Sequence, residues 1–192
     1  MRKRIEKADA AVVTLLNHAA TKWHPDLIKA QVRVTPLMVH PPVDKSGNPS
    51  GPALKLAGAP CVAKITVASA RDRLLAKTDA IVEIAADVWE RLDDAQRLAL
   101  VDHELEHLIV KRDDKGEIQT HDDCRPCLAT QPDDWVLTGF ASVVERHGQS
   151  SVEVLGLRAL ASGCQLLFDF ATGKASKPKK RKRNAGATEV AA

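Results

Sequence analysis

One short pattern, between Leu98 and Ile109, limits most strongly what this chain can fold into. It reads His103-Glu104-x-x-His107, and it lies inside a run whose apolar residues recur at helical spacing, namely Leu98, Val101, Leu105, Leu108 and Ile109. On a helix that turns by about 100° per residue, these apolar residues form one stripe, and the two histidines lie on the opposite side, one turn apart. The sequence therefore predicts a helix with one core-facing side and two imidazoles directed at a single point.

Two imidazoles one helical turn apart, with a glutamate beside them, are typical of a zinc hydrolase. Zinc accepts neutral imidazole nitrogens at ~2.0–2.1 Å and keeps a position open for water in catalytic sites. Glu104 can take a proton from that water. We therefore expect Zn²⁺ as the cofactor, His103 and His107 as metal ligands, and Glu104 as the catalytic base. A chance match on a solvated helical face is the alternative reading of the same pattern.

Alternation and helical spacing predict the other elements. Helices are expected at 7–22, 134–147 and 152–170, strands at 31–39, 61–67 and 80–85, and one helical turn at 87–92. Asp93-Asp94 is expected to cap the helix that carries the histidines. The core must be aliphatic, since the chain of 192 residues contains three Phe, three Trp and no Tyr. Aromatic platforms for stacking single-stranded nucleic acid are correspondingly scarce.

Charge is distributed unevenly along the chain. Residues 174–192 hold seven Lys or Arg and one Glu, whereas residues 1–173 carry a net charge of −3. We expect a disordered basic tail, whose run 177–183 either binds nucleic-acid phosphates non-specifically or only keeps the protein soluble. No apolar run approaches the ~20 residues that a membrane span needs. With four cysteines and no signal-peptide pattern, we expect a cytoplasmic protein with reduced thiols and no membrane partner.

Several stretches together resemble the phage metallopeptidases, a small zincin-like family found mainly in bacteriophages and prophages. The resemblance covers roughly residues 28–150, and it is carried by Thr78–Ala85, Val88-Trp89, Leu98–Leu108, Asp134-Trp135, Gly139-Phe140 and Val144–Gly148. It implies an α+β, minimal zincin-like fold, in which a small, mainly antiparallel sheet packs against the metal-binding helix and further helices. It also implies hydrolysis of peptide bonds, so the expected partner is a protein or peptide substrate.

The resemblance also implies a position for the third metal ligand. Members of the family usually carry a His-Asp pair just before the helix that corresponds to 136–147, and this chain has Pro132-Asp133-Asp134 there. Asp133 therefore occupies the position of the ligand His, and a carboxylate can bind zinc at ~2.0–2.2 Å. His121 is the alternative third ligand, because a short hairpin can fold back on the helix that it follows.

Other polar residues near the motif have two readings each. His121, Cys124 and Cys127 could form part of a structural zinc site, but such a site needs four ligands and no second pair follows, so reduced thiols are favoured. Asp102 and Glu106 either orient an imidazole or lie on a solvated helix surface. No catalytic role is expected for the remaining histidines, His18, His24, His40 and His147.

The expected organisation is an N-terminal helix at 1–27, a zincin-like catalytic domain at 28–150, a C-terminal helical extension at 151–173 and the basic tail at 174–192. The leading hypothesis is a zinc-dependent peptidase. One rival is a nucleic-acid-associated protein with a structural or vestigial zinc site, and another is a phage protein that binds a host protein without chemistry.

Overall fold

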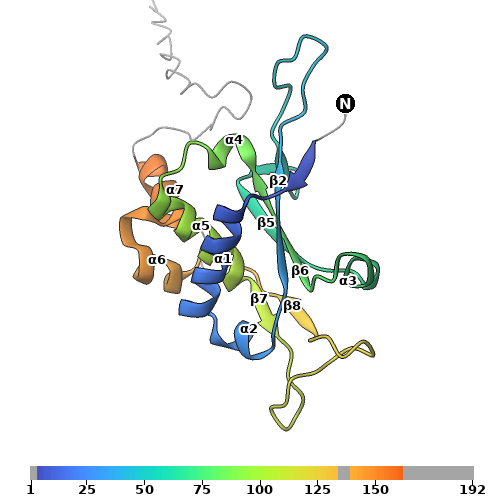
Figure 1. The fold of residues 1–192 in the computed structure, drawn as a ribbon. Helices are drawn as coiled ribbons and strands as arrows, with labels where there is room; N and C mark the ends of the chain where they lie inside the picture. The colour runs from blue at the N-terminus through green and yellow to red at the C-terminus, as the bar shows by residue number, and fades with distance from the viewer. Residues whose placement is uncertain (1–3, 134–138, 162–192) are drawn as a thin grey trace, which may run out of the picture.

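A four-stranded sheet forms the centre of the computed structural model, which describes residues 4–133 and 139–161 (Figure 1). Its strands follow the order β1 (Ile5–Lys7), β2 (Val34–Val39), β6 (Ala80–Ala85) and β5 (Ala63–Val67). Strands β2 and β6 run parallel, and the two outer pairs are antiparallel. Helices and small sheets together make the fold α+β, as the sequence predicts.

Strand β6 lies inside the sheet because one of its faces is apolar and both of its edges are paired. Ala80, Val82 and Ile84 alternate along the strand and are at most 2 % exposed. Its bounds are those predicted from the run of β-branched residues. Strand β5 is the outer neighbour of β6 and forms one edge of the sheet.

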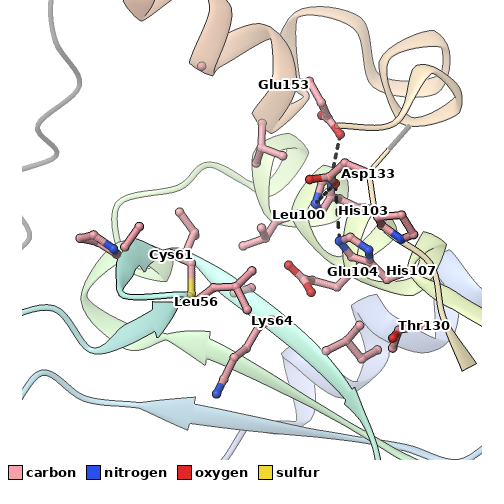
Figure 2. A pocket seen from close by; sticks show the side chains of 18 of the residues that line it. Leu56, Cys61, Lys64, Leu100, His103, Glu104, His107, Thr130, Asp133 and Glu153 are labelled. Atoms are coloured by element: carbon pink, nitrogen blue, oxygen red, sulfur yellow. Dashed lines mark hydrogen bonds and ion pairs between the residues drawn. The ribbon is translucent and has the colours of Figure 1, made fainter. Parts of the chain in front are cut away.

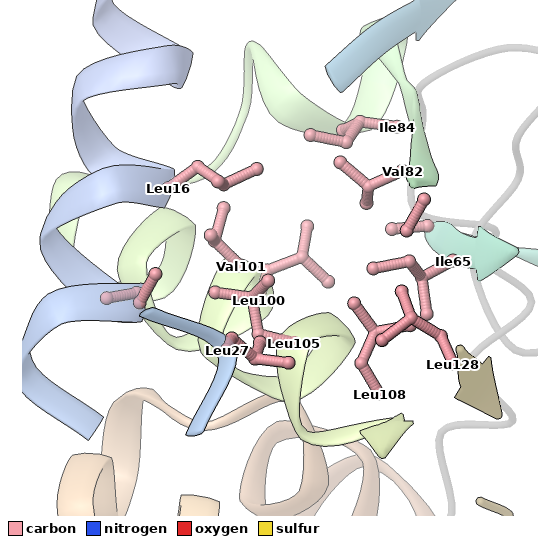
Figure 3. Packing of buried hydrophobic residues seen from close by; sticks show 14 of the residues in the cluster. Leu16, Leu27, Ile65, Val82, Ile84, Leu100, Val101, Leu105, Leu108 and Leu128 are labelled. Atoms are coloured by element: carbon pink, nitrogen blue, oxygen red, sulfur yellow. The ribbon is translucent and has the colours of Figure 1, made fainter. Parts of the chain in front are cut away.

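The main core lies between the sheet and two helices, α1 (Ala10–Trp23) and α5 (Asp94–Glu106) (Figure 3). Asp9 caps α1 by accepting a hydrogen bond from the Val12 amide. Asp93 caps α5 in a capping box with Gln96, which confirms the predicted start of that helix. Aliphatic side chains fill the space between the layers, among them Leu16, Leu27, Ile65, Val82, Ile84, Leu100, Val101, Leu105, Leu108 and Leu128.

Helix α5 ends earlier than the spacing of apolar residues predicts. It stops at Glu106 with His107 as its C-cap, and the chain continues as strand β7 (Leu108–Val110). Strand β7 pairs with β8 (Leu128–Thr130), so the backbone groups of Leu108 and Val110 bond across a hairpin instead of along a helix. Ile109 is 40 % exposed, and its predicted place on the core stripe was wrong.

Short elements complete the fold. They are α2 (Pro25–Lys29), β3 (Leu54–Leu56), β4 (Ala59–Cys61), α3 (Ala70–Ala76), α4 (Ala86–Trp89), α6 (Ala141–His147), a 3₁₀ turn (Gly148–Ser150) and α7 (Val152–Ala161). Pro25 begins α2, because proline is well tolerated at the first helical position.

The two predicted C-terminal helices are confirmed in part. Residues 139–140 are not helical, since Gly139 has φ +150°, so α6 begins only at Ala141. It ends at His147 with Gly148 as its C-cap, which confirms the predicted end. The predicted segment 134–138 and the part of the last helix beyond residue 161 lie outside the described residues, as does the basic tail. Among the described helices, none combines the length and the apolar character needed to cross a membrane.

Candidate metal centre

The end of α5 presents three side chains to one point, and the segment after β8 adds a fourth. His103 and Glu104 lie in the last turn of α5, and His107 caps it. Asp133 follows β8, and its Oδ1 lies 3.7 Å from Nε2 of His103 and 3.7 Å from Nε2 of His107 (Figure 2). Among the described residues, these two histidines and Asp133 form a group whose ligand atoms all lie within 4.8 Å of one another.

Each imidazole is held through its other nitrogen. His103 Nδ1 lies 2.7 Å from Glu153 Oε1, and His107 Nδ1 lies 2.7 Å from the backbone oxygen of Gln131. A carbonyl oxygen can only accept a hydrogen bond, so His107 carries its proton on Nδ1 and keeps the lone pair of Nε2 for a ligand. The same tautomer follows for His103 when Glu153 is ionised. Both imidazoles are thus oriented and protonated as metal ligands require.

Glu104 differs from an ordinary surface glutamate. Glu104 is only 5 % exposed, and burial raises the pKa of its carboxyl from 4.5 to about 7. The nearby His103 lowers this pKa, the Asp133 carboxylate raises it, and a hydrogen bond from the Ile65 backbone of β5 lowers it. Glu104 therefore lies between α5 and strand β5 at the edge of the sheet. Its carboxylate is a stronger base than that of an exposed glutamate.

The donor set fits a cation. Asp133 Oδ1 and Glu104 Oε2 are buried oxygens without a hydrogen-bond partner among the described residues, although a buried polar atom usually has one. Atoms bound to one tetrahedral zinc at ~2.0–2.1 Å lie roughly 3.3 Å apart. The observed 3.7 Å between Asp133 Oδ1 and each imidazole needs only a small contraction to reach that spacing.

The local charge also favours a cation. Burial lowers the pKa of His103, but the hydrogen bond to Glu153 and the charges of Glu104, Glu153 and Asp133 outweigh it and raise that pKa above 6.5. Three carboxylates around two imidazoles leave an excess of negative charge in a largely buried space. A divalent ion bound by the two Nε2 atoms and Asp133 would compensate this charge.

Glu153 is a residue of the site that the sequence analysis missed. It belongs to the first turn of α7, fifty positions after His103, and its side chain is 1 % exposed. Its Oε1 accepts hydrogen bonds from His103 Nδ1 and, at 3.2 Å, from the Phe140 amide. Burial raises the pKa of Glu153, but the hydrogen bonds from His103 and from backbone amides, together with the charge of His103, outweigh burial, so the pKa lies below its usual value.

Gly139 leaves room for the Glu153 side chain. A Cβ atom at Gly139 would lie 2.2 Å from Cγ of Glu153, and the φ of +150° is one that residues with side chains rarely adopt. Both the close approach and the backbone angle therefore require glycine here. Two features of the sequence could have pointed to Glu153: the glycine before Phe140, and an acidic residue at the start of a helix. Both are common for local reasons, so neither identifies a site residue.

His121 lies elsewhere. Its backbone amide donates to the Arg125 carbonyl in the loop between β7 and β8, and it neither lines the cleft at the metal helix nor joins a ligand group with His103 and His107. Cys124 and Cys127 are free thiols in the same loop. Within residues 4–133 and 139–161, no group of three potential metal ligands forms around His121.

Asp102 and Glu106 point to the back of α5, away from the imidazoles. Asp102 is fully buried, and it accepts hydrogen bonds from His24 Nε2 at 2.7 Å, Arg146 Nε at 2.8 Å and His147 Nε2 at 2.9 Å. Arg146 also binds Glu106 at 2.8 Å. His24, Asp102 and Glu106 are close enough to hold a metal, but the Arg146 guanidinium already supplies the positive charge. This cluster joins α1, α5 and α6.

A cleft of about 930 Å³ lies over the candidate metal centre. Its floor is α5, and its walls are the β3–β4 hairpin with β5, the segment 130–133 and the first turns of α7 (Figure 2). His103, Glu104, His107, Asp133 and Glu153 all line it. A ligand in the cleft therefore has direct access to the histidines and to Glu104.

Comparison with known proteins agrees with this arrangement. The family described as "Putative phage metallopeptidase" matches residues 52–161, a span of more than half of the chain that includes the metal helix, Asp133 and Glu153. Its start at residue 52 lies later than the roughly 28 expected from the resemblance, and its end lies within α7. No curated protein and no solved structure matches the chain. The chain belongs to the phage metallopeptidase family.

Proposed function

We propose that this protein is a zinc-dependent peptidase, in which His103, His107 and Asp133 hold the metal ion and Glu104 is the general base. The observation that carries the proposal is the position of Asp133 Oδ1, a buried oxygen without a hydrogen-bond partner among the described residues, 3.7 Å from both Nε2 atoms. Zinc is favoured because two imidazoles and one carboxylate match its usual catalytic ligand set.

The residues of the site divide the chemistry between them. A zinc ion held by His103, His107 and Asp133 would act as a Lewis acid that lowers the pKa of a water towards ~7 and polarises the substrate carbonyl. Glu104 accepts the proton of the attacking water and passes it to the nitrogen of the leaving amine. Burial of Glu104 suits this role, because a raised pKa makes its carboxylate a stronger base. Glu153 and the Gln131 carbonyl keep the imidazoles in the orientation that binding requires.

Metal analysis tests the metal centre, and a Glu104→Gln variant tests the base. We expect about one equivalent of zinc in the purified protein and in this variant, since Gln has nearly the same shape. Loss of the base should lower the hydrolysis rate of a peptide library by ~10²- to 10⁴-fold. A well-folded protein that does not bind zinc would refute the metal centre. Unchanged turnover in the variant would refute the role of Glu104.

The third ligand is tested separately by zinc titration of two alanine variants. Asp133→Ala should weaken zinc binding at least about tenfold, because it removes one of three protein ligands. His121→Ala is the matched control and should bind zinc like the wild type. Asp133→His should bind zinc as well as the wild type or better, since it restores the residue that the family usually has there. The reverse ranking of Asp133→Ala and His121→Ala would assign the ligand to His121.

A further inference from the structure

Beside the metal centre, one part of the cleft is lined by apolar residues. Leu100 lies one turn before Glu104 on α5, and Gly156 and Leu157 lie one turn after Val152 and Glu153 on α7. Leu56, in strand β3, closes the opposite side (Figure 2). These five residues, Leu56, Leu100, Val152, Gly156 and Leu157, are called the apolar end below. None of them is charged.

Gly156 is unusual because it stands inside a helix. Glycine there costs about 1 kcal/mol relative to alanine, so an interior glycine usually has a packing reason. At Gly156 that reason is absent among the described residues, because an added Cβ would meet no atom within 4 Å. Gly156 instead lines the cleft, and a side chain added there would extend into open space.

Leu56 provides a second observation. It is 61 % exposed although it lines the cleft, and a large exposed apolar side chain beside a cavity is typical of a ligand-binding surface. The lysine that lines the cleft, Lys64, pairs with Glu83 at 2.6 Å. Its charge is thereby compensated, and the apolar end has no charged group of its own for an acidic or basic side chain.

We propose that the apolar end binds a leucine- or phenylalanine-sized side chain of the peptide substrate, and that Gly156 sets the size of this subsite. Leu100 and Glu104 are separated by four residues, or about 6 Å along the helix axis. One residue of an extended peptide spans ~3.3–3.6 Å. The side chain bound here therefore belongs to a residue within about two positions of the cleaved bond. This inference rests on the proposed function, because it places the substrate relative to the metal centre.

Hydroxamates test the subsite without knowledge of the natural substrate, because the hydroxamate group binds the metal and an attached side chain probes the cleft. The zinc-loaded protein is titrated with acetohydroxamate and with a series of short peptide hydroxamates that carry a glycine, leucine, phenylalanine or aspartate side chain. The leucine and phenylalanine compounds should bind about 10- to 100-fold more tightly than the glycine compound, since they bury a whole apolar side chain. The aspartate compound should gain nothing.

Two variants of Gly156 test whether this gain in affinity comes from the apolar end. Gly156→Leu fills the apolar end and should remove most of the preference for leucine over glycine while leaving the affinity for acetohydroxamate unchanged. Gly156→Ala, which favours the helix, should reduce the preference for phenylalanine and serves if the larger variant does not fold. Ala76→Leu, on the exposed helix α3, is the matched control and should behave like the wild type.

The outcomes separate the two proposals. Acetohydroxamate binding without a preference for apolar side chains, or an unchanged preference in both Gly156 variants, would overturn the subsite and leave the metal centre intact. Absence of acetohydroxamate binding to the zinc-treated wild type would refute the proposed function, and the subsite with it.

Discussion

Glu153 offers the sharpest test of how the rest of the chain supports the metal centre. Replacement by glutamine keeps the length and shape of the side chain but removes its charge. The amide oxygen of Gln can take the place of Glu153 Oε1, which accepts hydrogen bonds from both His103 Nδ1 and the Phe140 amide. Only the carboxylate carries a charge, and that charge strengthens the bond to the imidazole. The Glu153→Gln variant therefore isolates the effect of that charge.

The size of the effect follows from the hydrogen bond at His103. A hydrogen bond to a charged group contributes about 1.5–3 kcal/mol, and a neutral one about 0.5–1.5 kcal/mol. The difference of roughly 1–1.5 kcal/mol corresponds to about a tenfold loss of zinc affinity. Glu153→Ala loses the bond altogether and should cost up to about 100-fold, the upper range for residues that orient a metal-binding histidine.

Competition between the protein and a chromophoric chelator measures these affinities, and the absorption of bound Co²⁺ reports the geometry of the site. Glu145→Gln, the same chemical change at an exposed position of α6, is the control and should bind zinc like the wild type. Unfolding of the metal-free proteins is measured in parallel, so that a loss of folding is not mistaken for a loss of affinity. Wild-type zinc affinity and an unchanged Co²⁺ spectrum in Glu153→Gln would refute the role assigned to this carboxylate.

Three further changes have defined outcomes. Gly139→Ala should weaken zinc binding about as much as Glu153→Gln, because its Cβ would displace the Glu153 side chain, and the chelator competition measures this. Asp102→Asn should lower the free energy of unfolding of the metal-free protein by about 3 kcal/mol, since it breaks a buried ionic cluster, whereas Asp94→Asn at the exposed helix start should change it little; urea denaturation compares the two. Deletion of residues 174–192 should leave zinc affinity unchanged and weaken any salt-sensitive binding to duplex DNA, and the same affinity and salt dependence in the shortened protein would contradict an electrostatic role of the tail.

Local signals in the sequence account for what could be predicted of the fold. Strand β6 was placed correctly because its run is rich in β-branched residues, and the start of α5 because Asp93-Asp94 is a typical N-cap pair. The end of α5 could not be found in this way. Leu108 and Ile109 continue the helical spacing, but pairing of β7 with β8 competes with the helix, and a partner strand twenty residues away is not visible in the local pattern.

In the candidate site, too, residues close together in the sequence could be predicted and residues far apart could not. His103, Glu104 and His107 could be named because the helix alone fixes their spacing, and Asp133 because the family resemblance marks its position. Glu153 could not be named, since an acidic residue in the first turn of a helix is already explained by the helix dipole. Its contact with His103 depends on the packing of α7 against α5, which no spacing in the sequence encodes.

The two sides of α5 explain why distant elements matter for the metal centre. Asp102 and His103 are adjacent in the chain and therefore about 100° apart around the helix. Asp102 ties the back of the helix to His24, Arg146 and His147, while His103 is held at the front by Glu153. The cluster around Asp102 fixes the position of α5, and the Glu153 carboxylate fixes the orientation of the His103 imidazole. Loss of Asp102 should therefore appear first in unfolding, and loss of Glu153 first in metal affinity, which makes the two contributions separable in one set of variants.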